Sequence, residues 1–165
     1  MATVTFKGET VELEGTPVAL NRTAPDFTVS EVGAGTASKE DFAGKVLLVS
    51  VVPDIDTSVC SIQSNRISDY AKQAGDGIEV VTISTNTDES LAKWKSDNDS
   101  TMRVFNDAVE FGKAYGVYMP ELDKLARSMF IIDADGNVVY EEIVNEVTNE
   151  PDYEKAIQAV DEIAK

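Results

Sequence analysis

Residues 46–52, Val-Leu-Leu-Val-Ser-Val-Val, form an almost unbroken apolar run that ends at Pro53. A strand that is apolar on both sides has to be covered on both faces, which is typical of the centre of a sheet flanked by helices. The stretch that follows, about 58–74, places Ile67 and Ala71 at helical spacing. The run therefore predicts a buried strand that leads directly into a long helix.

The rest of the chain continues this alternation of strands and helices. Further strands are expected at 78–84, 102–105, 128–132 and 138–142, with helices at about 88–97, 108–115 and from Pro151 onward. Before the apolar run we expect a hairpin at 4–6 and 11–13 around the turn 7–10, an edge strand at 24–29, a flexible loop at 33–38 and a helical turn at 39–42. This order predicts an α/β fold with a central mixed β-sheet flanked by helices, in a single domain spanning 1–165 with residues 1–15 as an N-terminal β-hairpin extension. A thioredoxin-like layout satisfies it.

The net charge and the single cysteine indicate which partners and which cellular compartment to expect. The formal net charge is −16, with 30 acidic and 14 basic residues, which argues against binding to nucleic acid or to anionic membrane surfaces. The N-terminus does not resemble a signal peptide, and the longest apolar run is far shorter than the ~20 residues of a membrane span. With one cysteine no internal disulfide can form, so we expect a reducing compartment, the cytoplasm.

The sequence contains no histidine, which removes most catalytic and metal-binding arrangements. Ser-His-Asp and Cys-His pairs are impossible, and one thiol cannot complete a zinc or copper site. The stretch Asp133-Ala134-Asp135-Gly136-Asn137 starts like a calcium loop but lacks that motif's later glycine and glutamate, so we interpret it as a hairpin turn. We expect no metal and no organic cofactor.

Cys60 is the candidate nucleophile, because it falls where the strand has ended and the helix begins. A free thiol is only about 3% thiolate at pH 7, and a helix N-terminus or a nearby cation raises that fraction. Thr57 or Ser58 is expected to cap the helix, and an arginine from another strand would supply the cation. The competing interpretation is an inert buried cysteine, the commoner state of a lone thiol.

The surrounding residues resemble a known family. The pattern Pro53-x-x-x-Thr57-x-x-Cys60 is similar to the active-site motif of peroxiredoxins, and Cys60-Ser61-Ile62-Gln63 is similar to their thiol peroxidase subfamily. Segments 24–27, 125–133 and 148–154 resemble the same subfamily, so the likeness spans almost the whole chain.

This resemblance implies a role for each of four residues. Cys60 would attack a peroxide oxygen and become a sulfenic acid, and Thr57 would hydrogen-bond the peroxide and the thiolate. Pro53 would shield the pocket from water, and Arg127 would hold the thiolate and stabilise the departing oxygen. It also implies a homodimer, a peroxide substrate, an external thiol reductant and no cofactor.

One position departs from the subfamily. Members of the subfamily typically carry a second, resolving cysteine, and that position is occupied by Lys95 in this sequence. An intramolecular disulfide is therefore impossible. The sulfenic acid would be reduced by an outside thiol, a small thiol or a thioredoxin-like protein, or would pair with Cys60 of a second subunit. We therefore expect a thiol-dependent peroxidase acting on hydrogen peroxide and organic hydroperoxides in antioxidant defence. The alternative is a thioredoxin-fold peroxide sensor or binding module without turnover.

Overall fold

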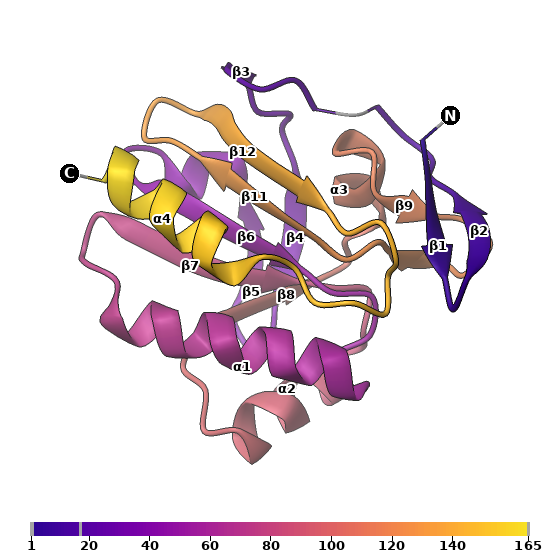
Figure 1. Cartoon of the computed structure of the whole chain (residues 1–165). Coiled ribbons are helices and arrows are strands. Elements are labelled where there is room, and N and C mark those ends of the chain that lie inside the picture. Colours follow the sequence, from indigo (N-terminus) through magenta and orange to yellow (C-terminus); the bar gives the residue numbers. More distant parts are fainter. Residues whose placement is uncertain (1, 17, 165) are drawn as a thin grey trace.

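A computed structural model describes residues 2–16 and 18–164, and its main feature is a mixed sheet (Figure 1). Eight strands of the described residues lie in the order β3-β12-β11-β6-β7-β8-β4-β5. Their bounds are β3 Arg22–Thr23, β4 Thr28–Glu31, β5 Gly35–Ser38, β6 Val46–Val51, β7 Ile78–Ile83, β8 Arg103–Asn106, β11 Ser128–Ile132 and β12 Asn137–Ile143. β6, β7 and β8 are parallel, and β11, β12 and β4 run against their neighbours.

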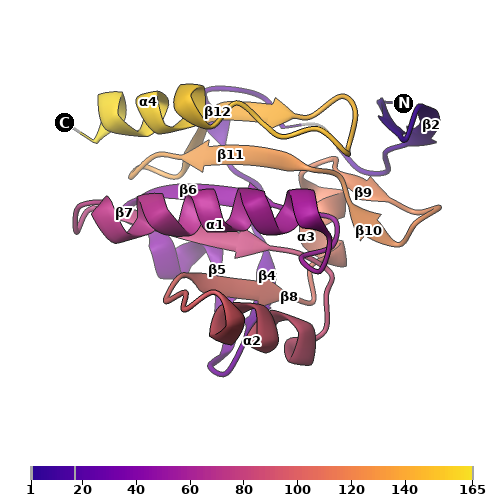
Figure 2. The ribbon, with the colours of Figure 1, turned by 60° about the horizontal axis from the view of Figure 1, so that its bottom comes forward.

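Helices cover both faces of this sheet (Figure 2). One face carries α1 (Ser58–Gln73), α2 (Asp88–Asp97) and α4 (Tyr153–Ile163), and the other carries α3 (Val109–Ala114) and the 3-10 turn η1 (Lys39–Phe42). All six residues of β6 are buried, with Leu48 packed in the α1 face and Val49 in the α3 face. The prediction of a central strand buried on both sides is confirmed.

α1 connects β6 to its parallel neighbour β7, and this crossover places the start of α1 at the carboxyl edge of the sheet. Ile67 fills the interface between helix and sheet and is fully buried. Burying such a side chain contributes about 1.5–3 kcal/mol, which holds the helix in one position on the sheet. The residue at the helix start, Cys60, is thereby fixed over the end of β6.

The N-terminal strands β1 (Thr3–Phe6) and β2 (Glu9–Glu12) form the predicted hairpin. Its connection is a two-residue turn, Lys7-Gly8, in which both residues have positive φ, as hairpins of this length prefer. The hairpin docks on the segment after β12, where Thr5 N donates to Asn145 O and Val147 N donates to Thr5 O. It therefore lies beside the same edge of the sheet as the start of α1 (Figure 1).

Most predicted elements are confirmed, and three expectations change. Residues 35–38 form the edge strand β5 instead of a flexible loop, because they pair with β4. The strand expected at 24–29 begins only at Thr28, after Pro25, and lies between β8 and β5 rather than at the edge. The last helix starts at Tyr153 with Asp152 as its cap, so Pro151 precedes the helix.

Three short strands were not predicted. β3 (Arg22–Thr23) pairs with β12 at the edge of the sheet, and β9 (Tyr118–Met119) and β10 (Lys124–Leu125) pair as a small hairpin. The segment interpreted as a hairpin turn, 133–137, does join β11 to β12, and Asp133 accepts hydrogen bonds from the main chain of Asp135 and Asn137. Across residues 2–16 and 18–164, none of the helices combines the length and the apolar character that crossing a membrane requires.

Candidate active site

Cys60 is buried in the first turn of α1, with 1% of its surface exposed. The helix starts there because Pro53 ends the strand and Thr57 takes an extended backbone at the N-cap. Cys60 is thus the third residue of the helix, where free N–H groups and the helix dipole favour a negative charge.

Arg127 reaches the sulfur from the other side. It directly precedes β11, it is 2% exposed, and its Nη2 lies 3.2 Å from Cys60 Sγ. Its other nitrogens are also occupied, since Nη1 donates to Gln63 Oε1 at 2.8 Å and Nε donates to Val147 O at 2.6 Å. A buried guanidinium held by two other acceptors presents a fixed positive charge to the sulfur.

Gln63 is a site residue to which the sequence analysis gave no role. It is fully buried, and its Nε2 donates to Ser50 Oγ on β6 at 2.8 Å while its Oε1 accepts from Arg127. The signal that identifies it is its spacing: residues three apart on a helix share a face, so Gln63 lies on the same inward face as Cys60. Gln63 therefore ties the guanidinium to the central strand.

Thr57 and Pro53 lie where they were predicted, at the cavity beside the sulfur. Thr57 occupies the N-cap position, but its hydroxyl donates to Asp54 O at 2.9 Å and makes no side-chain cap hydrogen bond. The proton of the hydroxyl is used in this way, so its lone pairs are the part of the group that can accept a hydrogen bond. Pro53 is buried between the end of β6 and the cavity.

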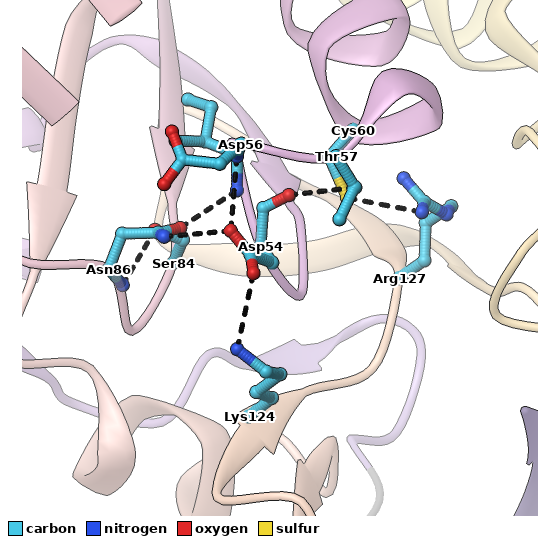
Figure 3. A network of polar contacts seen from close by, with 9 residues as sticks. Asp54, Asp56, Thr57, Cys60, Ser84, Asn86, Lys124 and Arg127 are labelled. Carbon is cyan, nitrogen blue, oxygen red and sulfur yellow. Dashed lines mark hydrogen bonds and ion pairs between the residues drawn. The ribbon is translucent and has the colours of Figure 1, made fainter. Parts of the chain in front are cut away.

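The turn between β6 and α1 is held by a polar network that sequence reasoning missed (Figure 3). Asn86, after β7, accepts from Ile55 N at 2.8 Å and donates to Asp54 Oδ1 at 3.0 Å, and Lys124 Nζ lies 3.5 Å from Asp54 Oδ2. Burial works to raise the pKa of Asp54, but the hydrogen bonds from Asn86 and Asp56 and the charge of Lys124 outweigh it and lower that pKa. This network fixes the turn that carries Thr57.

The four predicted residues border one cavity of about 330 Å³. Its lining comes from four separate parts of the chain: Phe6, Lys7, Pro53, Asp54, Thr57, Ser58, Val59, Cys60, Lys124, Arg127, Val147 and Thr148. Three cationic residues (Lys7, Lys124 and Arg127) and one carboxylate (Asp54) line it, so its charged groups are mainly positive in a chain of net charge −16. Among the described residues no group of three or more acidic, cysteine or histidine side chains is placed to hold a metal ion.

The position expected for a resolving cysteine lies on α2. Lys95 is half-buried there, and its neighbour Trp94 donates from Nε1 to Ser61 Oγ at 3.1 Å. α2 therefore lies beside the first turn of α1, although Cys60 is the only cysteine of the chain.

The fold is thioredoxin-like, with a mixed sheet covered by helices on both faces. At the carboxyl edge of this sheet a buried thiol contacts a buried guanidinium, an arrangement typical of proteins whose chemistry uses a cysteine thiol. A model of the Redoxin family matches residues 19–157. A thiol peroxidase of Bacillus subtilis (strain 168) is 43% identical over the full length of both chains, and one of Staphylococcus aureus (strain COL) is 42% identical over 96% of this chain and 98% of its own.

Solved structures agree in fold. A peroxiredoxin-like protein from Aquifex aeolicus superposes with a TM-score of 0.90 at 27% identity, covering 99% of this chain and 98% of its own. A thiol peroxidase from Chromobacterium violaceum gives a TM-score of 0.84 at 17% identity, covering 100% and 99%, and supports the fold alone. The chain belongs to the Redoxin family and, within it, to the thiol peroxidases, oxidoreductases that reduce peroxides at the expense of a thiol.

Proposed function

We propose that Cys60 is the peroxidatic nucleophile and that Arg127, Thr57 and Pro53 assist it. The observation that carries this proposal is the distance of 3.2 Å between Arg127 Nη2 and Cys60 Sγ, both buried beside one cavity. A buried cation in contact with a buried thiol is costly unless the sulfur carries negative charge. The pair is therefore suited to hold a thiolate for attack on an electrophile.

In the proposed reaction the thiolate attacks the terminal oxygen of a hydroperoxide. A new S–O bond forms, the O–O bond breaks, and the sulfur is oxidised to a sulfenic acid. The leaving oxygen takes the electron pair of the broken bond and then a proton, so the peroxide is reduced to water or an alcohol. Arg127 stabilises the charge that builds on this oxygen, Thr57 Oγ1 accepts a hydrogen bond from the peroxide O–H, and Pro53 excludes water.

Recycling uses an external thiol, because the single cysteine leaves no internal partner. One thiol attacks the sulfenic acid, releasing water and forming a mixed disulfide, and a second thiol then displaces Cys60. A disulfide between Cys60 residues of two chains is disfavoured, since only 1% of Cys60 is exposed and two Cα atoms would have to approach within about 7 Å.

Three further expectations belong to this proposal: one domain over 1–165, a reducing compartment such as the cytoplasm, and assembly as a homodimer. The lone thiol supports the compartment, and the resemblance to peroxiredoxins supports the dimer. Size-exclusion chromatography with light scattering tests the dimer, which a monomer at micromolar concentration would exclude.

Turnover with a small dithiol tests the proposed function. Peroxide consumption with dithiothreitol should continue for many equivalents per chain in the wild type and stop in Cys60→Ser. Consumption of a single equivalent, with no dependence on dithiothreitol, would instead identify a sensor that does not turn over.

A further inference from the structure

The N-terminal hairpin forms part of the wall of the Cys60 cavity. Phe6, at the end of β1, and Lys7, in the turn, line it together with Cys60, Arg127 and Val147. Phe6 is half-buried, and Lys7 Nζ lies 5.5 Å from the centre of its ring. The hairpin is therefore not only an appendage of the sheet but one surface of the site.

A single carboxylate holds the tip of this hairpin in place. Glu146 Oε1 accepts from Gly8 N at 2.8 Å and from Thr5 Oγ1 at 2.9 Å, and its Oε2 accepts from Lys7 N at 3.2 Å. Thr148 adds two bonds to Oε2, from its main-chain N at 3.0 Å and its hydroxyl at 2.7 Å. These hydrogen bonds, those of Thr148 first, lower the pKa of Glu146 to about 2.

The carboxylate also stabilises the backbone of the turn, where one of the two positive φ angles falls on a residue other than glycine. Lys7 has a φ of 53° and Gly8 a φ of 85°, so a non-glycine residue sits in the left-handed region. Both N–H groups donate to Glu146, which offsets the cost of that conformation and fixes where Phe6 and Lys7 lie.

The segment that carries Glu146 also contacts the catalytic arginine. Val147 O accepts from Arg127 Nε, and Val147 N donates to Thr5 O. These main-chain bonds do not involve the Glu146 side chain, so removing its carboxylate frees the tip of the hairpin while the position of Arg127 is kept.

We propose that Glu146 is a positioning residue that sets substrate preference by holding Phe6 against the organic group of a hydroperoxide. This inference rests on the proposed role of Cys60. Hydrogen peroxide is small enough to need only the sulfur, Thr57 and Arg127. The organic group of a hydroperoxide extends into the cavity, whose apolar lining is Phe6, Pro53, Val59 and Val147.

The test compares two peroxides on the same variants. Single-turnover oxidation of Cys60 is measured by stopped flow with hydrogen peroxide and with cumene hydroperoxide for the wild type, Glu146→Ala, Phe6→Ala and the double variant. Glu14→Gln is the matched control, since Glu14 also contacts the fold through a carboxylate, 3.5 Å from Lys113 Nζ, but does not line the cavity. Circular dichroism and the melting temperature show whether each variant is folded. If Glu146→Ala unfolds, Phe6→Ala still tests whether the hairpin side of the cavity contacts the organic group of the peroxide.

We expect Glu146→Ala and Phe6→Ala each to lower the rate constant for cumene hydroperoxide by about tenfold, as loss of an apolar pocket contact does. The rate constant for hydrogen peroxide should change by less than about twofold, and Glu14→Gln should affect neither. The double variant should be no slower than Phe6→Ala alone, because Glu146 acts through the position of Phe6. Equal losses for both peroxides, or no loss for either, would overturn the proposal. Slow oxidation of the wild type by both peroxides would instead refute the role of Cys60.

Discussion

Replacing Arg127 by methionine is expected to slow the oxidation of Cys60 by hydrogen peroxide by about 100-fold. One hydrogen bond to a charged group contributes about 1.5–3 kcal/mol, which corresponds to about 10- to 150-fold in rate. The bond in question is the 3.2 Å contact from Nη2 to the sulfur. In the proposed reaction the same guanidinium also stabilises the departing oxygen, and losing one such donor costs about 10²–10³ in rate.

The variant also has a predictable cost in stability. Methionine leaves Gln63 Oε1 and Val147 O without their buried donor, at about 1–3 kcal/mol each. Rates are therefore compared at a temperature where circular dichroism shows both proteins folded. Arg127→Lys, which keeps a point charge but not the planar fork, should fall between methionine and the wild type.

Tryptophan fluorescence provides the assay. Trp94 is the only tryptophan, and its Nε1 donates to the hydroxyl of Ser61, the residue after Cys60. A change at the sulfur should alter its emission, so stopped-flow mixing with excess peroxide gives the rate constant directly. A folded Arg127→Met protein that reacts within about threefold of the wild type would refute the reasoning.

Three other predictions concern Gln63 and Lys95 near the sulfur and Glu146 at the hairpin. Gln63→Leu should slow oxidation by about tenfold in the same assay, because one guanidinium nitrogen of Arg127 loses its acceptor; an unchanged rate would remove Gln63 from the site. Lys95→Cys should yield an internal disulfide with Cys60 after peroxide treatment, seen as a loss of two hydrogens by mass spectrometry, and persistence of the sulfenic acid would contradict this. Glu146, with a pKa of about 2 against its ordinary 4.5, should still be ionised at about pH 3.5 in a carboxyl ¹³C NMR titration. Its contribution to stability is then complete above about pH 4.5 and lost as the pH falls toward 2, and titration near 4.5 would show that the hairpin contact is not formed.

The sequence was sufficient for the elements with strong hydrophobic patterns. β6 is apolar on both faces, and Thr87 caps α2 with a hydrogen bond from Ser90 N, so these positions follow from local chemistry. β9 and β10 have two residues each, too few for a periodic pattern, and β5 is stabilised by pairing with β4 rather than by its own composition. Such elements depend on contacts that a local pattern does not contain.

The residues of the candidate site also differ in whether a local sequence pattern predicts them. Cys60 and Thr57 follow from the end of a strand and the start of a helix, and Arg127 was assigned only through the family resemblance. The acceptors that orient Arg127 come from 64 positions before it and 20 after it, at Gln63 and Val147. The hairpin contact with Glu146 spans about 140 positions, from Thr5 to the segment after β12. No spacing rule reaches across such separations, so only the assembled sheet reveals these partners.

Intact-mass measurement on the wild type after rapid mixing with one equivalent of hydrogen peroxide tests the central claim most directly. The account predicts the addition of one oxygen at Cys60 within the mixing time, reversed by an added dithiol, and no addition in Cys60→Ser. Oxidation as slow as that of a free cysteine in solution would contradict it.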